Sequence, residues 1–211
     1  MLQYKVVDGP TLDILIKLNN SDLFKNYRLV GGTALALIQG HRKSIDLDFF
    51  GIEKIDSDEL ITLLKSIGKL REVKTSKRID SLFLDDVKID IVRYPYEWID
   101  SPLIEDNLRL ASKKEIAAMK IAAIVNRGTK KDFIDLNELL DTFSLNEIID
   151  FYINKFKDSS IFFALKSVVY FDDAEDQEMP FMFNNITWQT VKDNIKKAHA
   201  SYMLQNEVPG E

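Results

Sequence analysis

The sequence predicts an α/β (α+β) protein, with a small mixed β-sheet flanked by helices in its first half and a helical lobe in its second. Runs that alternate apolar and polar residues, as half-buried strands do, fall in the first half, whereas the second half shows repeated helix-start signals. The chain has 211 residues, of which 45% are hydrophobic, which is enough for a sizeable core with an appended lobe. We therefore expect a core over residues 1–108 and a helical lobe over 109–211, packed together with a cleft between them.

Glycines and capping residues divide the first half into short elements. In chain order we expect a helix over 11–25, a strand over 27–30, a helix over 33–39, a strand over 45–50, a helix over 56–67, and strands over 70–75, 81–84 and 87–93. Gly31 and Gly32 break the first strand, Gly40 ends the second helix, and Asp56 caps the third. Two acidic residues at 85–86 separate the last two strands, which indicates a hairpin.

The second half carries residues that mark the starts of helices. Ser-x-x-Glu sequences at 112–115 and 144–147 are typical capping boxes, and Thr129 can cap a helix between them. The expected helices run over 112–126, 129–142, 144–157, 160–170 and 187–204. Several aromatic side chains are expected to form the core of this lobe, namely Phe143, Phe151, Phe156, Phe162 and Phe163.

The composition excludes several classes of site. The chain has no cysteine and only two histidines, His41 and His199, so thiolate metal sites are excluded and a zinc site is not expected. A metal bound here should be a hard cation with oxygen ligands. The N-terminal residues lack the basic-then-apolar pattern of a signal peptide, and no apolar run reaches the ~18 residues of a membrane span. We therefore expect a cytoplasmic protein with no membrane partner.

Charge is unevenly distributed along the chain. The net charge of −6 argues against a general nucleic-acid coat protein. Between Arg109 and Lys131, however, there are seven basic residues and a single acidic one, Glu115, whereas 171–178 is strongly acidic. The basic stretch is interpreted either as a solvated helix face or as a local phosphate-binding surface.

Three aspartates in predicted strands form the first candidate site. Asp46 and Asp48 are two residues apart in the strand over 45–50, so alternation places both on one face. Two neighbouring carboxylates repel each other unless a cation lies between them, and magnesium prefers carboxylate and phosphate oxygens. Asp90 lies in the strand over 87–93 and completes a three-carboxylate cluster if the two strands are neighbours. The alternatives are an ordinary surface pair of carboxylates, and an Asp90 that pairs with a basic neighbour, Lys88 or Arg93.

A glycine-rich junction precedes these aspartates. Gly31, Gly32 and Thr33 lie between a strand and a helix, where glycines let the backbone approach a phosphate and the helix start offers free N–H groups. Arg42 and Lys43 follow shortly before the aspartates and are suited to meet phosphate charge. The alternative is that the two glycines form only a turn.

The conjunction of these features resembles a known family. The run VGGTALALIQGHRKSIDLDFF and the later run MKIAAIVNRGTKKDFIDLNELL are similar to the AbiEii-type nucleotidyltransferase toxins of bacterial abortive-infection and toxin–antitoxin systems. These toxins belong to the polymerase-β-like nucleotidyltransferase superfamily. The resemblance covers residues 27–140 and implies that the small sheet is a nucleotidyltransferase core.

The resemblance implies a role for each matching residue. Nucleotide-binding residues would be Gly31, Gly32, Thr33, Arg42, Ser44, Lys120 and Arg127. Asp46 and Asp48 would bind two metal ions, and Asp90 would bind the one that activates the acceptor hydroxyl. Lys120 would face the phosphates, with Asp132 and Asp135 orienting Lys120, Arg127 or the acceptor; the catalytic set would then be Asp46, Asp48, Asp90, Lys120 and Asp132. The superfamily usually has Ser where Thr33 stands, and Thr keeps the hydroxyl.

Spacing in the helical half is compatible with those roles. Lys113 and Lys120 are seven residues apart and share a helix face, and Asp132 and Asp135 are three apart and share another. The alternative is an ordinary surface salt bridge between two helices.

The expected reaction is the magnesium-dependent transfer of an NMP from an NTP to an acceptor hydroxyl, with the active site in the cleft between the two parts. Two Mg²⁺ ions are expected, with Mn²⁺ as a substitute. The acceptor candidates are tRNA, another RNA or a protein, and the resemblance implies a cognate antitoxin. Two alternatives remain: a catalytically silent binding or antitoxin-like module of the same fold, and phosphoryl transfer to a protein side chain.

Overall fold

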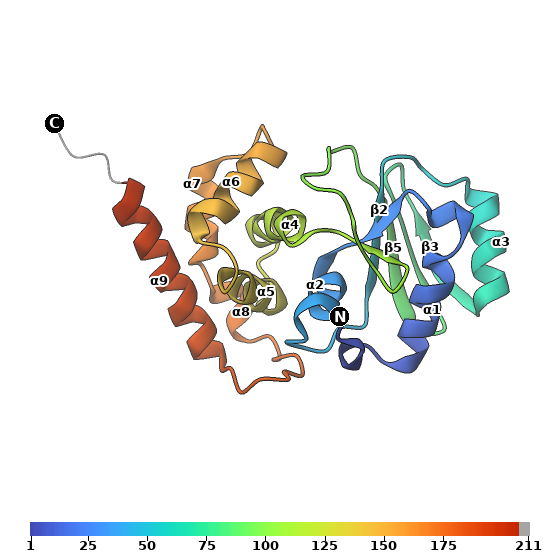
Figure 1. The fold of residues 1–211 in the computed structure, drawn as a ribbon, viewed down its shortest axis with the longest axis horizontal. Coiled ribbons are helices and arrows are strands. Elements are labelled where there is room, and N and C mark those ends of the chain that lie inside the picture. Colours follow the sequence, from blue (N-terminus) through green and yellow to red (C-terminus); the bar gives the residue numbers. More distant parts are fainter. Residues whose placement is uncertain (207–211) are drawn as a thin grey trace. The chain divides into compact units, whose positions relative to one another are not determined.

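The computed structural model describes residues 1–206, which form two compact units, Met1–Ser112 and a second that begins at Lys113. The first unit contains a seven-stranded sheet, and the second is built from helices. Figure 1 shows the strands β2, β3 and β5 of the first unit and the helices α4 to α9 of the second. The predicted α/β (α+β) class, with a mixed sheet followed by helices, is confirmed.

The sheet has the strand order β3-β4-β5-β2-β1-β7-β6. Its strands are β1 (Tyr27–Leu29), β2 (Leu47–Gly51), β3 (Leu70–Thr75), β4 (Ile79–Leu84), β5 (Val87–Arg93), β6 (Leu103–Glu105) and β7 (Leu108–Leu110). β2 pairs in parallel with β5, and β1 pairs in parallel with β7, while the other neighbours are antiparallel. The parallel pairing of β2 and β5 joins strands far apart in the sequence, and it positions the candidate site described below.

One face of the sheet is buried because its strands alternate apolar and polar residues. In β2, Leu47 and Phe49 are almost completely buried, whereas Asp48 and Phe50 lie on the other, half-exposed face. The Phe24 ring packs edge-on against Phe49, with the ring centroids 5.0 Å apart. The apolar face therefore anchors the sheet, and the opposite face remains available for polar side chains.

The helical elements of the first unit are α1 (Gly9–Asn19), α2 (Gly31–Gln39), α3 (Ser57–Ile67) and the short 3₁₀ helices η1 (Tyr4–Val6) and η2 (Asp22–Phe24). Asp56 caps α3 and Gly40 ends α2, as predicted. Several predicted boundaries are wrong: the helix predicted over 11–25 ends at Asn19, the helix predicted over 33–39 begins at Gly31, and the strand predicted over 45–50 begins only at Leu47, so Asp46 precedes the strand.

The β6–β7 hairpin was not predicted from the sequence. Its strands have three residues each, too few for alternation to stand out, and its turn places Asp106 and Asn107 in the left-handed region with φ of 51° and 62°. Asn19 fixes this hairpin, because its side-chain amide donates to the Asn107 carbonyl at 2.6 Å and its side-chain oxygen accepts from the Arg109 N–H at 3.0 Å.

The second unit consists of α4 (Lys113–Asn126), α5 (Lys130–Leu140), α6 (Leu145–Lys155), α7 (Ile161–Val168), α8 (Asp172–Glu175) and α9 (Trp188–Asn206). α4 packs against α5, α6 and α7, and α9 packs against the same three helices. The aromatic prediction is wrong in part: Phe162 and Phe163 are 68% and 60% exposed, whereas Phe133 and Phe171 pack together with ring centroids 4.9 Å apart. Over residues 1–206, no helix is long and apolar enough to span a membrane.

Gly51 offers a test of the packing between β1 and β2. A Cβ added there would lie 2.7 Å from carbons of the Tyr27 ring, which is buried. We expect Gly51→Ala to lower the free energy of unfolding by about 1–3 kcal/mol through overpacking. Gly9→Ala is the control, because a Cβ there has no atom within 4 Å; it should be neutral or slightly stabilising. Equal denaturant midpoints for the two variants would contradict this account.

Candidate active site

The sheet register brings two of the predicted carboxylates together. In the parallel pair β2–β5, Asp48 lies directly opposite Asp90, so both side chains leave the same face of adjacent strands. Neighbouring strands are about 4.8 Å apart, and both residues are half-buried. Two like charges are therefore held side by side, which is the arrangement that a cation stabilises.

Asp46 is positioned differently. It precedes β2, and its backbone carbonyl accepts a hydrogen bond from the Thr33 hydroxyl. Within residues 1–206, no three acidic or histidine side chains are arranged to hold a metal ion as they stand. The register therefore provides a pair, Asp48 and Asp90, while the convergence of Asp46 with that pair stays a prediction for the metal-bound protein.

Lys88 supplies a positive charge at this pair. It is on the same face of β5 as Asp90, and its Nζ donates to Asp90 Oδ2 at 2.8 Å. The hydrogen bond to Asp90 raises the pKa of the Lys88 ammonium; burial opposes the rise, and the charges of Asp90, Asp46 and Asp48 add to it. The ion pair with Lys88 that the sequence left open is thus present, and the ammonium lies in the field of all three carboxylates.

The donor set fits a hard divalent cation. Among residues 1–206, the buried Asp90 Oδ1 has no hydrogen-bond partner, although buried carboxylate oxygens are normally paired. Magnesium typically takes one or two protein carboxylates and completes its shell with water and substrate phosphates. The pair of Asp48 and Asp90 matches that requirement, and the chain has no cysteine for a softer metal.

Gly31 lets the start of α2 lie against the Asp48 carboxylate. Its φ is +69°, and a Cβ at this position would lie 2.6 Å from Asp48 Oδ2. Val30 N–H also donates to the Asp48 carbonyl at 2.9 Å, and no side chain caps the N-terminus of α2. An uncapped helix start beside a carboxylate that is a candidate metal ligand is suited to phosphate. The glycine is thus required by both its backbone angle and the close approach.

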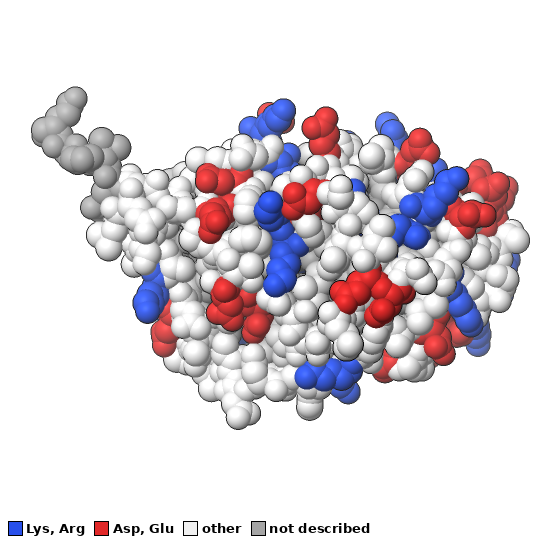
Figure 2. Space-filling view, viewed as in Figure 1, with Lys and Arg blue, Asp and Glu red and all other residues white. Residues whose placement is uncertain are grey.

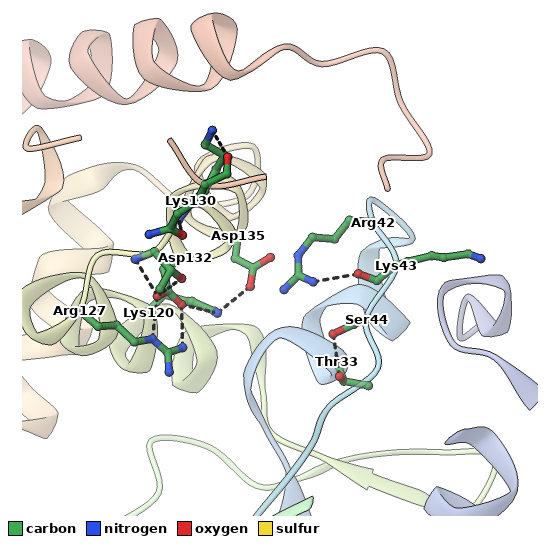
Figure 3. A network of polar contacts seen from close by, with 11 residues as sticks. Thr33, Arg42, Lys43, Ser44, Lys120, Arg127, Lys130, Asp132 and Asp135 are labelled. Carbon is green, nitrogen blue, oxygen red and sulfur yellow. Dashed lines mark hydrogen bonds and ion pairs between the residues drawn. The ribbon is translucent and has the colours of Figure 1, made fainter. Parts of the chain in front are cut away.

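Thr33 and Ser44 are anchors rather than exposed phosphate ligands. Both are buried, and their hydroxyl oxygens are 2.8 Å apart (Figure 3). Because Thr33 also donates to the Asp46 carbonyl, its hydroxyl fixes the segment that leads into β2. The expected contact between the Thr33 hydroxyl and a phosphate is therefore at odds with this geometry. Arg42 is also buried, and it donates to the Lys43 carbonyl at 3.0 Å.

In the second unit, Lys120 is held between two aspartates of α5. Its Nζ is 3.1 Å from Asp132 Oδ1 and 2.6 Å from Asp135 Oδ2 (Figure 3), and all three side chains are at most 6% exposed. The surface salt bridge considered from the sequence is thus wrong, because the cluster is buried. Arg127 donates to both oxygens of Asp132, at 2.9 and 3.1 Å, and so completes the cluster.

The Asp132 carboxyl is strongly stabilised in its charged form. Burial alone would raise its pKa, but the Lys120 ammonium, the Arg127 guanidinium and the Thr129 hydroxyl together hold the pKa well below its ordinary value. Thr129 and Asp132 also form a capping box at the start of α5. Asp132 therefore both starts a helix and fixes two cations.

The basic stretch over 109–131 does not form one surface. Lys130 is buried and donates to the backbone carbonyls of Glu175, at 2.9 Å, and Gln177. Arg109 belongs to β7, where its guanidinium donates to the carbonyls of Asn19 and Phe24. On the face shown in Figure 2, basic and acidic residues are interspersed. Lys130 and Arg109 are therefore engaged with backbone carbonyls, and a local phosphate-binding surface formed by the other basic residues of this stretch stays a prediction.

Sequence reasoning missed the role of Lys88 and the reason for Gly31. Lys88 was considered as an ion-pair partner of Asp90 on the same strand face, but not as a competitor with a metal ion for that carboxylate. The close contact of Gly31 with Asp48 depends on long-range pairing, for which the sequence carried no signal.

Comparisons with known proteins identify the family of the chain. A family model described as "Nucleotidyl transferase AbiEii toxin, Type IV TA system" matches residues 13–204. An uncharacterized protein of Aquifex aeolicus (strain VF5), aq_aa25, is 30% identical over 199 residues, which cover 90% of this chain and 95% of that protein.

Two solved structures are similar in fold. MenT4, a nucleotidyltransferase toxin (Rv2826c) from Mycobacterium tuberculosis H37Rv, superposes with a TM-score of 0.61 at 15% identity, over 95% of this chain and 82% of that one. JHP933 from Helicobacter pylori has a TM-score of 0.57 at 18% identity, over 94% and 96% of the two chains. At these identities the likeness concerns the fold.

The buried cluster of α4 and α5 predicts a large stability effect. Lys120→Met leaves Asp132 and Asp135 buried with one cation fewer, and losing one partner of a buried ion pair costs about 3–5 kcal/mol. Lys65→Met is the matched control, because Lys65 is exposed on α3; it should change the free energy of unfolding by less than about 0.5 kcal/mol. Urea denaturation of both variants measures the difference, and two equal curves would show that the cluster does not support the fold.

The Lys88–Asp90 pair predicts an effect on metal affinity. Because the ammonium competes for the Asp90 carboxylate, Lys88→Met should bind Mn²⁺ more tightly. The Lys88 side chain is 42% exposed, so the pair is worth at most about 1 kcal/mol, or about fivefold in affinity. Calorimetric titration with Mn²⁺ in the absence of nucleotide measures this change, with Lys77→Met as an exposed control. Weaker Mn²⁺ binding by Lys88→Met would show that Lys88 supports the metal instead of competing with it.

Proposed function

The chain belongs to the nucleotidyl transferase AbiEii toxin family of type IV toxin–antitoxin systems and is a nucleotidyltransferase, and on this premise we propose that it transfers an NMP from an NTP to an acceptor hydroxyl with the help of Mg²⁺. The observation that carries the proposal is the register of Asp48 and Asp90, with the start of α2 against Asp48. The family implies an NTP substrate and a cognate antitoxin. We place the reaction in the cytoplasm, where NTPs are available.

The proposed roles follow from the geometry of the first unit. Asp48 and Asp90 supply carboxylate oxygens on one sheet face, and Asp46 joins them from the segment before β2. Bound Mg²⁺ would offset charge on the phosphates and make the acceptor hydroxyl a better nucleophile. Gly31 and Gly32 place backbone N–H groups at the start of α2 toward phosphate, and Thr33 fixes this junction through Ser44.

The proposed reaction breaks one bond and forms one. The acceptor oxygen bonds to the α-phosphorus, the bond from the α-phosphorus to the bridging oxygen breaks, and pyrophosphate leaves while the hydroxyl proton passes to solvent. Catalysis would rest on positioning and electrostatics, which explains why the site needs neither His nor Cys.

In the second unit, the candidate phosphate-binding cation is already engaged in ion pairs. Lys120 is the residue proposed to serve the nucleotide phosphates, yet its ammonium is bound by Asp132 and Asp135. We propose that these two aspartates fix the position of Lys120 and so act as positioning residues. Arg127 is a second candidate for phosphate contact, because its side chain is 63% exposed although it also bonds Asp132.

The acceptor candidates are tRNA, another RNA or a protein. Of the alternative functions, a catalytically silent module is the one that a specific contact favours, since the Lys88 ammonium occupies one oxygen of Asp90. The unpartnered Asp90 Oδ1 and the close fit of Gly31 to Asp48 support the catalytic proposal over it.

Asp48 provides the direct test. Incubation with each labelled NTP, Mg²⁺ and total RNA or cell lysate should yield a labelled product, and Asp48→Ala should lower its formation at least about 100-fold. The melting temperature should stay equal or rise, because one of two like charges is removed. Asp13→Ala, an exposed change on α1, is the control. A folded Asp48→Ala protein with full transfer would refute the metal role, and a product heavier by only a phosphate would indicate phosphoryl transfer.

A further inference from the structure

The first unit contains a cavity that the catalytic proposal does not use. Its volume is about 310 Å³, and it is lined by residues of β1, the segment before β1, the segment after β2, the segment after β5, and β7. Its charged and aromatic lining residues are Lys25, Tyr27, Arg28, Glu53, Trp98 and Arg109. The cavity is of the size that accepts one small ligand.

The cavity carries a local excess of positive charge on an acidic protein. Its lining contains three basic residues, Lys25, Arg28 and Arg109, and one acidic residue, Glu53, whereas the whole chain has a net charge of −6. Arg109 Nε is buried and has no hydrogen-bond partner among the described residues. A buried donor is normally paired, so an unused one beside a basic cavity indicates an anionic ligand.

An aromatic surface accompanies this charge. The Arg28 guanidinium lies 4.1 Å from the centroid of the Trp98 ring, and its Nη1 donates to the Asp100 carbonyl at 2.7 Å, which fixes the guanidinium plane. The Trp98 ring packs against the Tyr94 ring at a centroid distance of 5.3 Å, and the Tyr94 ring packs against the Phe50 ring at 5.1 Å. Flat aromatic and guanidinium groups of this kind stack nucleobases.

The register connects this cavity with the carboxylate pair. Arg28 of β1 lies opposite Phe50 of β2, and Phe50 is two residues after Asp48, on the same face of the strand. Two residues along a strand span about 7 Å. Arg28 is therefore one strand across and one strand repeat along from Asp48, within the reach of a nucleotide that reacts there.

We propose that this cavity binds a nucleotide unit, with the base stacked on the Arg28–Trp98 surface and the phosphate bound by Lys25 and Arg109. This proposal rests on the proposed function, in which a nucleotide is the substrate. Two sources supply such a unit: the base of the incoming NTP, whose phosphates would lie at the metal site, and the terminal nucleotide of the acceptor, whose own phosphate would lie at Lys25 and Arg109. In both cases the site lies beside the reacting phosphate and determines which nucleotide is used.

Fluorescence of Trp98 tests the site directly. The chain has two tryptophans, so Trp188→Phe leaves Trp98 as the only one. The probes are the four ribonucleoside monophosphates, the matching nucleosides and inorganic phosphate, each without Mg²⁺. We expect saturable quenching by at least one monophosphate and weaker responses to its nucleoside and to phosphate. Calorimetric titration of the unsubstituted protein with the same probes guards against a packing effect of the Trp188 change.

Substitutions then assign the contacts. Arg28→Met and Lys25→Ala should each weaken monophosphate binding by about tenfold, as expected for the loss of one charge-assisted contact. Lys17→Ala, an exposed change on α1, should leave binding unchanged. Lys25 is exposed, so its variant remains informative if Arg28→Met folds poorly. The absence of saturable binding by every monophosphate, or an affinity of both variants equal to that of the unsubstituted protein, would overturn the proposal.

Two further measurements distinguish the NTP base from the acceptor nucleotide as the ligand, and the cavity proposal from the proposed function. If the NTP base occupies the cavity, saturating Mg-NTP removes the response to the monophosphate; if the acceptor nucleotide occupies it, the response persists. Asp48→Ala should retain monophosphate binding, because the measurement needs no metal. Binding without any transfer activity would therefore contradict only the proposed function, and transfer without monophosphate binding would contradict only the cavity.

Discussion

The parallel pairing of β2 with β5 is the constraint on which the site depends. It places Asp48 opposite Asp90 on a half-exposed sheet face, although 41 intervening residues separate them in the chain. Two carboxylates at this spacing repel, and the buried face of the same strands, anchored by Leu47 and Ile89, holds them there. The core of the first unit thus stabilises an arrangement of charge that is unfavourable by itself and is relieved by a cation, from Lys88 or from a metal.

Neighbouring elements are adapted to this pair. Gly31 takes a left-handed backbone conformation that brings the start of α2 against Asp48, and Thr33 ties the same helix to the segment before β2. Strand, helix start and connecting segment therefore fix one another. A cluster of this kind is stiff, and stiffness is what a reaction based on positioning requires.

Much of the fold could be predicted from local signals, and the site could be predicted in part. Gly40, Asp56 and the 85–86 turn marked ends that the structure reproduces. The β6–β7 hairpin was missed because three-residue strands show no period, and its place in the sheet depends on contacts with Asn19. The sequence identified the three aspartates as candidates. It did not predict that Asp46 precedes the strand or that the Thr33 hydroxyl is buried, because both depend on long-range packing that no local pattern encodes.

The buried cluster of Lys120, Arg127, Asp132 and Asp135 contains two positive and two negative side chains and is therefore neutral as a whole. Loss of Lys120, Asp132 or Asp135 leaves an uncompensated charge, because these three side chains are almost completely enclosed. Such a set changes in evolution only by compensating steps, so homologues should keep all four residues or replace oppositely charged members together. The residues at these positions should therefore be retained or replaced together. Their retention in a family would reflect the free-energy cost of separating buried charges as much as any contact with a substrate.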